Sequence, residues 1–469
     1  MALVPLLLAI EGIGWRRAAL LGLTVGVVHA GVAYRWMFQV PGFALHHAAI
    51  LAFYLGLYPA AWAVGVATFR RRGLPISVLG PALWVALDYA RSHAGFLAVS
   101  WGTLAHSQHR DLALLQVASL AGEYGVTFLV VLGNMALAEC LTRRAWPPAL
   151  LSGAVVALAH LGGALALQES TGPARVRIAV VQPSITVEER ETTEGWAASL
   201  ERLEHLTRQG AAARPAAIVW PETAVRALTR DPELVVRVEA LARETDTPLV
   251  VGSSDFVKLR VAGPKARVET RGYNMAYLVL PGAGTGEPYH KILLVPFGEY
   301  RPLESMVRWP TWLVPRVMEA LPGETRRQLI LPDGTSLAPL ICWENLFGDF
   351  VRAWVHDGAR LFVQLTNDAW FGMSAAPRQH NLASVLRAVE NRTPVAIASN
   401  TGPSQIIDPF GRVVTEIPGL FVAGVAWADV PPGTGGTLYT RSGDVFALAM
   451  AAVVALGMLA SELGWMRPS

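Results

Sequence analysis

Three polar residues with complementary chemistry follow apolar, strand-like runs of this sequence. Glu222 closes the run AAIVWPE, Cys342 ends the run LAPLIC, and Lys291 lies in YHKILLVPFGEY. Loops at strand ends are where α/β folds place reactive groups. A cysteine attacks as the thiolate, and since its free pKa is about 8.5 it needs a base and a nearby cation. Glu222 would take the thiol proton, and Lys291 would stabilise the thiolate and a later oxyanion. The set predicts acyl transfer through a thioester.

The neighbours of Cys342 strengthen this interpretation. A free cysteine is by itself more often a small buried hydrophobe than a nucleophile. Trp343 and Glu344 follow Cys342 and take the segment from its strand into a polar turn. The other cysteine, Cys140, stands at the end of an apolar stretch and is expected to be inert. Two cysteines cannot form a disulfide scaffold in a chain of this size.

The region that carries these residues has the pattern of an α/β domain, which we place at about 174–432. Short runs rich in Val, Ile and Leu predict buried strands at 177–183, 216–222, 248–254, 273–281, 337–343, 360–367 and 394–400. Helical periodicity predicts helices near 194–213, 232–245 and 379–392. The run SQIIDPFGRVV (404–414) predicts a hairpin that turns at Asp408–Gly411.

The remainder of the chain has the composition of a membrane protein. Of its 469 residues, 52% are hydrophobic and 16% are charged, well below the share of charged residues in soluble proteins. Apolar stretches lie at 2–12, 17–37, 46–69, 75–92, 112–141, 146–168 and 444–464. Several reach the length of about 20 residues that spans a bilayer. We therefore expect a helical membrane bundle over 1–169 and a last spanning helix over 444–464. The net charge of +3, without a long basic run, does not favour nucleic-acid binding.

The loops between the apolar stretches predict an orientation. Arginine clusters follow alternate stretches, at Arg16–Arg17, Arg70–Arg72 and Arg143–Arg144. The intervening loops, 38–45 and 93–111, are poorer in Arg and Lys. The positive-inside rule places the clusters in the cytoplasm. The α/β domain would then face the periplasm of a Gram-negative cell, and the last helix would return inward and end near Arg467.

The motifs around the three residues resemble those of known families. WPETA (220–224), HKILLVPFGEY (290–300) and PLICWEN (339–345) look like the Glu-Lys-Cys signature of the nitrilase superfamily. Further motifs, together with the flanking helices, are similar to the apolipoprotein N-acyltransferase family. They are LVPFGEY, LICWE, LTNDAWFG (365–372), RQH (378–380), RAVENRTPVAIASNTG (387–402) and IIDPFGRVV (406–414).

The resemblance implies a fold and a set of roles. The fold is an α/β, αββα nitrilase-type sandwich on a polytopic transmembrane α-helical bundle. Glu222 would be the general base, Lys291 the oxyanion-stabilising cation and Cys342 the nucleophile. Three further residues match supporting positions, although Trp343 stands where the family more often has Tyr; they are Glu299, Trp343 and Glu344.

The resemblance also implies a reaction and its partners. Cys342 would take an acyl chain from a membrane phospholipid and pass it to the α-amine of the S-diacylglyceryl cysteine of an apolipoprotein. This is the final step of lipoprotein maturation, in the bacterial inner membrane. The implied partners are a phospholipid donor, a diacylated apolipoprotein acceptor and the bilayer. No nucleotide or metal cofactor is implied, and His290 and His380 lack a second metal ligand at useful spacing.

Two loops are candidates for contact with the lipid. The segment 301–318 is apolar, is interrupted by three prolines, and contains Trp309 and Trp312. Because tryptophan favours the membrane interface, this segment is expected to enter the outer leaflet and shape the lipid entrance. The alternative is a structural loop that covers the sheet. Asn367, Trp370 and Phe371 are expected at the edge of the pocket, with turn formation after a strand as their alternative.

Some features depart from the family pattern. The chain begins inside what resembles the family's second hydrophobic stretch, so the first helix is apparently missing. After AVVQP the sequence reads SITVEERE (184–191) in place of an Asn-Ile-Pro-Gln-like run, near the acceptor or lipid path. Three ionisable residues lie in or near apolar helices, and they would line a substrate path or bond helices together. They are His29, Asp88 and Glu123.

Other functions are compatible with parts of the sequence. A membrane-tethered nitrilase-type amidase would use the same three residues, but one helix would suffice as its tether. A polytopic transporter or receptor would not need the Glu-Lys-Cys set, and the apolar stretches show no matched, repeated broken helices. A degenerate, inactive relative is the third alternative.

Overall fold

The computed structural model describes residues 2–143, 146–169, 173, 175–261, 267–314 and 319–463. The chain forms two compact units. The helical unit comprises residues 1–169 and 437–469, and the α/β unit comprises residues 170–436. Arg144, Pro315 and Arg467, which entered the topology and loop hypotheses, lie outside the described residues.

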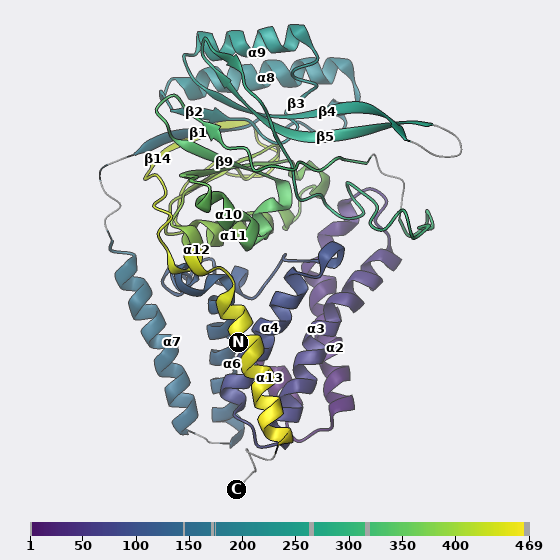
Figure 1. Ribbon diagram of the computed structural model, residues 1–469, viewed down its shortest axis with the longest axis vertical. Coiled ribbons are helices and arrows are strands. Elements are labelled where there is room, and N and C mark those ends of the chain that lie inside the picture. The colour runs from purple at the N-terminus through teal and green to yellow at the C-terminus, as the bar shows by residue number, and fades with distance from the viewer. Residues whose placement is uncertain are drawn as a thin grey trace. The chain divides into compact units, whose positions relative to one another are not determined.

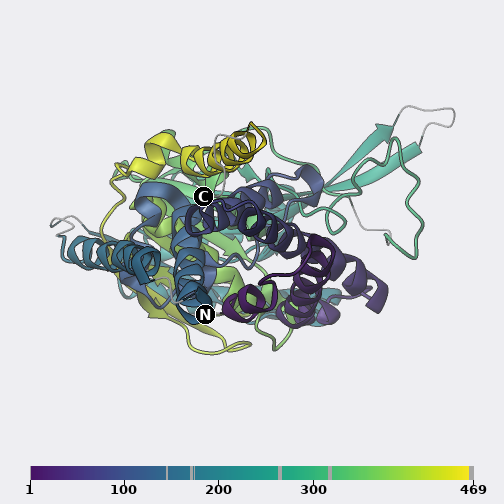
Figure 2. The same cartoon turned by 90° about the horizontal axis from the view of Figure 1, so that it is seen from below.

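The helical unit consists of apolar helices (Figure 1). They are α1 (Val4–Ala9), α2 (Trp15–Ala33), α3 (Leu45–Arg71), α4 (Ile76–Ser92), α5 (Leu112–Leu115), α6 (Ala118–Arg143), α7 (Trp146–Ala166), α12 (Leu438–Ser442) and α13 (Val445–Glu462). Within the described ranges, four segments are long and apolar enough to cross a membrane: α3, most of α6, most of α7 and α13. The prediction of a bundle of apolar helices is confirmed. Figure 2 views these helices from below, with α7 (blue) at the margin of the bundle.

The apolar stretch over 112–141 is divided between two helices. The chain forms the short helix α5 and then α6, which is broken near its start. Ala121 and Gly122 have non-helical backbone angles, and φ of Gly122 is +64°. A Cβ atom on Gly122 would lie 2.5 Å from the ring of Tyr439. Glycine is therefore required at this position both by its backbone conformation and by the close ring.

Small residues bring α2 and α3 into close contact. Ala18, Gly22, Gly26 and Ala30 recur every four residues on α2 and are buried. A Cβ atom on Gly26 would lie 2.6 Å from the Cα atom of Gly56 on α3. Such a small-xxx-small pattern lets helix backbones approach closely where lipid offers no hydrophobic driving force.

The buried charges of the helical unit have partners. Asp88 lies 3.3 Å from Arg91 (Oδ1 to Nη2), and Glu123 lies 3.7 Å from His106 (Oε2 to Nε2). All four side chains are almost fully enclosed. This favours a structural role for Asp88 and Glu123, whereas His29 is exposed on α2.

The α/β unit contains two sheets. In the first the order is β14–β1–β2–β4–β5–β6, with β3 beside β4 and β7 beside β5. Its strands are β1 (Val176–Gln182), β2 (Ala217–Val219), β3 (Val225–Arg226), β4 (Leu249–Val261), β5 (Arg267–Leu280), β6 (Gly284–Thr285), β7 (Tyr289–His290) and β14 (Gly424–Val430). In the second the order is β13–β12–β11–β10–β9–β8. Its strands are β8 (Leu329–Ile330), β9 (Ser336–Ile341), β10 (Leu361–Thr366), β11 (Val395–Ser399), β12 (Gln405–Ile407) and β13 (Val413–Glu416).

Helices cover the outer face of each sheet (Figure 1). The helices α8 (Thr193–Ala211) and α9 (Pro232–Glu244) lie on the first sheet, and α10 (Gly348–His356) and α11 (Ala376–Asn391) lie on the second. The predicted αββα layering is confirmed. Both α8 and α9 begin at a side-chain cap, because Thr192 accepts from the N–H of Gly195 and Asp231 from that of Leu234.

The parallel strands β1, β2 and β4 of one sheet, and β9, β10 and β11 of the other, end in loops that carry the candidate site. The predicted strands 216–222 and 337–343 end earlier than expected, at Val219 and Ile341. Glu222 and Cys342 therefore lie beyond their strands. The hairpin over 404–414 is formed by β12 and β13, with the N–H of Gly411 donating to the carbonyl of Asp408.

The hairpin β4–β5 was predicted too short. The expected strands 248–254 and 273–281 continue to Val261 and begin at Arg267, and the hairpin projects from the sheet in both views (Figures 1 and 2). Its outer part lacks an apolar run, since it has no core to face. The helix α10 was also missed, although the residues that it buries, Val351, Trp354 and Val355, stand at helical spacing.

Candidate active site

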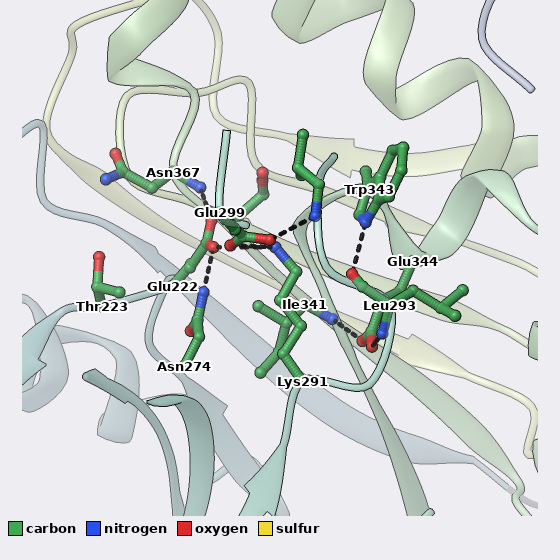
Figure 3. Close-up of polar contacts among 12 residues, drawn as sticks. Glu222, Thr223, Asn274, Lys291, Leu293, Glu299, Ile341, Trp343, Glu344 and Asn367 are labelled. Carbon is green, nitrogen blue, oxygen red and sulfur yellow. Dashed lines mark hydrogen bonds and ion pairs between the residues drawn. The ribbon is translucent and has the colours of Figure 1, made fainter. Parts of the chain in front are cut away.

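Glu222 is held by two donors, one from strand β5 and one from the loop after β10 (Figure 3). It lies three residues beyond β2 and is 7% exposed. The side chain of Asn274 donates to its Oε1 at 2.6 Å, and the backbone N–H of Asn367 donates to its Oε2 at 2.8 Å. These two contacts fix both oxygens of the carboxylate and so orient it.

The surroundings of Glu222 suit a proton acceptor. Burial raises the pKa of Glu222 above its ordinary value; the charge of Lys291 opposes this rise, and those of Glu299 and Asp368 add to it. A carboxyl group whose pKa is moved towards neutrality is better matched to accept a proton at physiological pH.

Lys291 follows β7 and is 1% exposed. Its Nζ lies 2.8 Å from Oε1 of Glu299 and 3.9 Å from Oε1 of Glu222. Burial disfavours the ammonium, but the carboxylates of Glu299 and Glu222 more than offset burial, so the pKa of Lys291 is raised. Lys291 is therefore a permanent cation beside the proposed base. Its backbone is fixed as well, since its N–H donates to the carbonyl of Asn274 at 2.8 Å.

Glu299 positions this cation. Its Oε1 accepts from Lys291, and its Oε2 accepts from the backbone N–H of Val295 at 2.7 Å. One carboxylate thus joins the lysine to the PFGEY turn.

Cys342 occupies a strained turn between β9 and the 3₁₀ helix η5 (Cys342–Leu346). Its φ is +55°, a left-handed conformation that non-glycine residues rarely adopt outside tight or functional turns. Burial and the charge of Glu222 raise the pKa of the Cys342 thiol, while Lys291 lowers it, and the result lies well above the ordinary value. The resting sulfur is therefore a thiol, which has to lose its proton during the attack.

Glu344 connects the turn at Cys342 (the nucleophile turn) with the segment around Lys291 (the lysine loop, 289–293). Its Oε2 accepts from the N–H of Ile341 at 2.8 Å. Its Oε1 accepts from the hydroxyl of Tyr289 at 2.7 Å and from the N–H groups of Ile292 at 2.8 Å and Leu293 at 3.1 Å. Burial raises the pKa of Glu344 to about 7, although these donors act in the opposite direction. The carboxyl thus fixes the residues on both sides of the reacting atoms.

Trp343 makes a second link between the same loops. Its indole N–H donates to the carbonyl of Leu293 at 2.6 Å (Figure 3). Its ring meets that of Phe347 edge-on, at 5.0 Å between centroids. The family more often has Tyr at this position, which would offer a hydroxyl group as donor. In this chain the indole N–H of Trp343 makes the link instead.

A buried polar network lies behind the nucleophile turn. His380 contacts Oδ1 of Asp368 at 3.1 Å through Nδ1 and Oδ1 of Asn345 at 3.1 Å through Nε2. Asn345 in turn donates to Ser384 at 2.9 Å. His380 is therefore part of a hydrogen-bond network, and across the described ranges no three potential metal ligands lie together.

The predicted pocket residues occupy different environments. Asn367 is buried and contacts the base through its backbone, which is closer to the chemistry than a pocket edge. Trp370 and Trp312 are exposed, and Phe371 is half-buried. Trp309 is half-buried, with its indole N–H donating to Pro302 at 2.6 Å and its ring 5.5 Å from that of Phe297.

Some residues of the site were not anticipated from the sequence. Asn274 stands within the predicted strand 273–281, where a polar side chain in an apolar run was the available signal. Tyr289 and Asn400 gave no such signal, since the former precedes the lysine and the latter ends a strand. Asn400 donates to Oδ1 of Asn367 at 2.8 Å and so supports the loop that contacts Glu222.

Two known families match different parts of the chain. Residues 177–439 match the carbon-nitrogen hydrolase family, and residues 1–136 match the apolipoprotein N-acyltransferase N-terminal domain. Among solved structures, an amidase from Nesterenkonia sp. aligns with 60% of this chain and 99% of its own, at 19% sequence identity and a TM-score of 0.39.

Curated relatives match nearly the whole chain. The apolipoprotein N-acyltransferase of Geobacter metallireducens is 35% identical over 97% of this chain and 89% of the relative. That of Gloeobacter violaceus is 31% identical over 98% of this chain and 89% of the relative. The chain belongs to the apolipoprotein N-acyltransferase family.

Proposed function

We propose that this chain moves an acyl group from a membrane phospholipid to the α-amine of an N-terminal S-diacylglyceryl cysteine on an apolipoprotein. A thioester on Cys342 would link the two half-reactions. The observation that supports this most directly is the arrangement of Glu222, Lys291 and Glu299 around a cysteine on a strained strand-end turn. Family membership supplies the acyltransferase class.

The first half-reaction would form the thioester. Glu222 takes the thiol proton as the sulfur of Cys342 attacks the ester carbonyl of the phospholipid. Lys291 stabilises the oxyanion of the tetrahedral intermediate. The intermediate collapses with cleavage of the ester C–O bond, and Glu222 returns its proton to the leaving alkoxide. The products are a lysophospholipid and acylated Cys342.

The second half-reaction would transfer the acyl group to nitrogen. An α-amine has a pKa of about 8 and is mostly protonated at neutral pH, so it must first lose one proton to water before it attacks. The neutral amine adds to the thioester carbonyl, Glu222 takes the second proton from nitrogen, and the C–S bond breaks. Cys342 regains a proton from Glu222, and the amide product is far less labile than the thioester.

A loop of the α/β unit has the character of a lipid contact. In the described part of the 301–318 segment, large apolar side chains are exposed at Leu303, Met306 and Trp312, the last two at 83% and 65%. We propose that this loop enters the outer leaflet. There its apolar side chains would be removed from water, which is favourable. Trp370 and Met373 are also exposed and would flank the acyl chain.

The proposed orientation places the α/β unit in the periplasm and the arginine clusters in the cytoplasm, from the positive-inside rule. Cysteine labelling in spheroplasts tests it. In a Cys140→Ala, Cys342→Ala background, a cysteine at exposed Glu324 should react with a membrane-impermeant maleimide. Labelling of that site only after cell lysis would reverse the orientation.

The test of the reaction is acyl capture. The full chain, purified in detergent, is incubated with a phospholipid that carries an alkyne-tagged acyl chain. We expect a hydroxylamine-sensitive label on the intact protein and none on Cys342→Ala. Addition of a diacylated lipopeptide should then discharge the label into the peptide as a hydroxylamine-resistant amide.

Two outcomes would contradict the proposal. A well-folded protein that takes no label from any phospholipid, but hydrolyses a small amide through Cys342, would be a membrane-bound amidase. Label that persists in Cys342→Ala would place the nucleophile elsewhere.

A further inference from the structure

The segment that departs from the family pattern, 184–191, folds into a rigid element beside Glu222. The N–H of Thr186 donates to the carboxylate of Glu189 at 2.7 Å, and the N–H of Glu189 donates back to the Thr186 hydroxyl at 3.2 Å. Arg202 of α8 donates to the same carboxylate at 2.8 Å. These contacts hold the backbone that leads into the 3₁₀ helix η4 (Glu189–Glu191), which carries Arg190.

Arg190 reaches the residue that directly follows the proposed base. Its Nη1 donates to the Thr223 carbonyl at 3.0 Å and to the Thr223 hydroxyl at 2.8 Å. Thr223 has a φ of +48°, although it is β-branched. Such a conformation is costly and persists only where the surroundings hold it. The guanidinium therefore clamps the strained turn that aims Glu222.

Trp196 and Arg226 contact Arg190 in turn. Its carbonyl accepts from the indole N–H of Trp196 at 2.7 Å and from Nη2 of Arg226 at 3.1 Å. Both guanidinium groups lie over the Trp196 ring, at 5.4 Å for Arg190 and 4.2 Å for Arg226. Burial lowers the pKa of Arg190 to about 10, while the charge of Glu222 acts to raise it, so Arg190 stays charged at neutral pH.

The same segment also contacts the other support of Glu222. The side chain of Asn400 donates to the carbonyl of Ile185 at 2.7 Å and accepts from the Ile185 N–H at 3.0 Å. Asn400 also donates to Asn367, whose N–H binds Glu222. The segment thus meets the turn after Glu222 through Arg190, and the donor to its carboxylate through Ile185.

Two guanidinium nitrogens of Arg190, Nε and Nη2, are buried without an acceptor in the part of the chain that the structure describes. Buried donors are nearly always paired, because an unpaired one loses its hydrogen bonds to water. Stability of the fold alone therefore does not explain a charged side chain at this place.

We propose that Arg190 is a positioning residue for Glu222, acting through its clamp on the Thr223 turn. The proposal rests on the proposed function of Glu222 as general base. Arg190 would not touch the substrate; it would keep the carboxylate in line with the Cys342 thiol through both half-reactions.

The test follows acylation of Cys342 over time in the full-length protein, with the alkyne-tagged phospholipid, across a range of pH. We expect Arg190→Gln to slow acylation by about 10- to 100-fold, the scale expected from a misplaced catalytic group. The acidic limb of its profile of acylation rate against pH should move to higher pH, because loss of a positive charge near Glu222 raises the pKa of that carboxyl group. Arg190→Lys keeps the charge and one donor, and should recover part of the rate.

Two further variants isolate the clamp. Arg243→Gln removes an exposed cation in the last turn of α9, which is not among the contacts of Arg190 or Thr223 described above, and should change the rate by no more than about threefold. Thr223→Gly allows the positive φ without strain. In that background the loss caused by Arg190→Gln should be smaller than in the native sequence, and an equal loss would overturn the clamp.

A second readout separates this proposal from the proposed function. In a Cys140→Ala background, alkylation of Cys342 by iodoacetamide requires no lipid, and Arg190→Gln should slow it about tenfold at pH 7. If the protein takes no acyl label but alkylation still depends on Arg190, the lipid donor is wrong and the positioning role stands. If folded Arg190→Gln acylates and alkylates as the native protein does, the positioning role is wrong. Equal losses in Arg190→Gln and Arg243→Gln, matched by equal falls in Tm, would also overturn it.

Discussion

The strand-end residues and the 301–314 loop of the α/β unit are built in opposite ways. Glu222 and Lys291 are 7% and 1% exposed. Strand β5 and the loop after β10 hold Glu222, and Glu299 holds the ammonium of Lys291. Met306 and Trp312 are 83% and 65% exposed, at the surface of a segment without helix or strand. The strand-end residues are thus buried and fixed by hydrogen bonds, whereas the 301–314 loop exposes large apolar side chains.

This difference separates two tasks. Proton transfer and oxyanion stabilisation depend on groups placed before the substrate arrives, so their rates fall steeply when a support is removed. Recognition of an acyl chain depends on apolar area, which is non-directional and tolerates small shifts. Substitutions in the first region should therefore act on kcat, and those in the loop on KM.

The largest effect after loss of the nucleophile is expected for Glu222→Gln. The amide cannot accept the thiol proton, so the acylation rate should fall by about 10²- to 10⁴-fold. In the native protein the rate should fall as the pH drops through the raised pKa of Glu222, because the protonated carboxyl is no longer a base. The measurement is the acylation rate constant against pH.

Glu201→Gln is the matched control, since Glu201 is exposed on α8. It should leave the rate and its pH profile unaltered. A Glu222→Gln protein that acylates within tenfold of the native rate would assign the base to another residue.

A smaller loss, of about 10²-fold, is expected for Glu344→Gln. The amide offers one acceptor oxygen where the carboxylate accepts from Tyr289 and three backbone N–H groups. The nucleophile turn and the lysine loop should therefore shift relative to each other. Trp343→Phe removes one link between the same loops and should cost less than Glu344→Gln. Equal acylation rates in Glu344→Gln and in the native protein would show that Glu344 does not position the site.

Glu344 also makes a prediction for stability. Its pKa in the folded state, about 7, lies above the ordinary 4.5, so the folded protein binds the proton more tightly than the unfolded chain does. Its favourable contribution is complete below about pH 4.5 and is lost as the pH rises through about 7. Tm measured over this range should fall less in Glu344→Gln than in the native protein.

The sequence was informative where chemistry coincides with strand ends. Glu222 and Cys342 follow apolar runs. This placement, the complementary chemistry of Lys291 and the resemblance to nitrilase motifs together indicated a common site. The residues that support them were harder to predict. The polar Asn274 in an apolar strand was a signal, but its contact with Glu222, like that of Asn400 with Asn367, joins segments far apart in the sequence. The break at Gly122 was hidden for a related reason, since the ring that requires it belongs to Tyr439.

The smallest effect is expected for Trp312→Ser in the loop. Full burial of a large apolar side chain in the membrane contributes about 1.5–3 kcal/mol, so the KM for phospholipid should rise about tenfold or more with kcat little changed. Trp309 is the internal comparison, because its indole N–H donates to Pro302 and its ring packs against Phe297. Trp309→Ser should disturb the loop itself and lower Tm as well as raise KM.

The two tryptophans therefore distinguish a lipid contact from a structural loop. If Trp312 contacts lipid, Trp312→Phe should retain most of the affinity, because it keeps a large apolar ring at the exposed position. If the loop only covers the sheet, Trp312→Ser should leave KM unchanged while Trp309→Ser still lowers Tm. That second pattern would confine the role of the loop to the fold and move lipid recognition to other surfaces, of which the exposed Trp370 and Met373 would be the next to test.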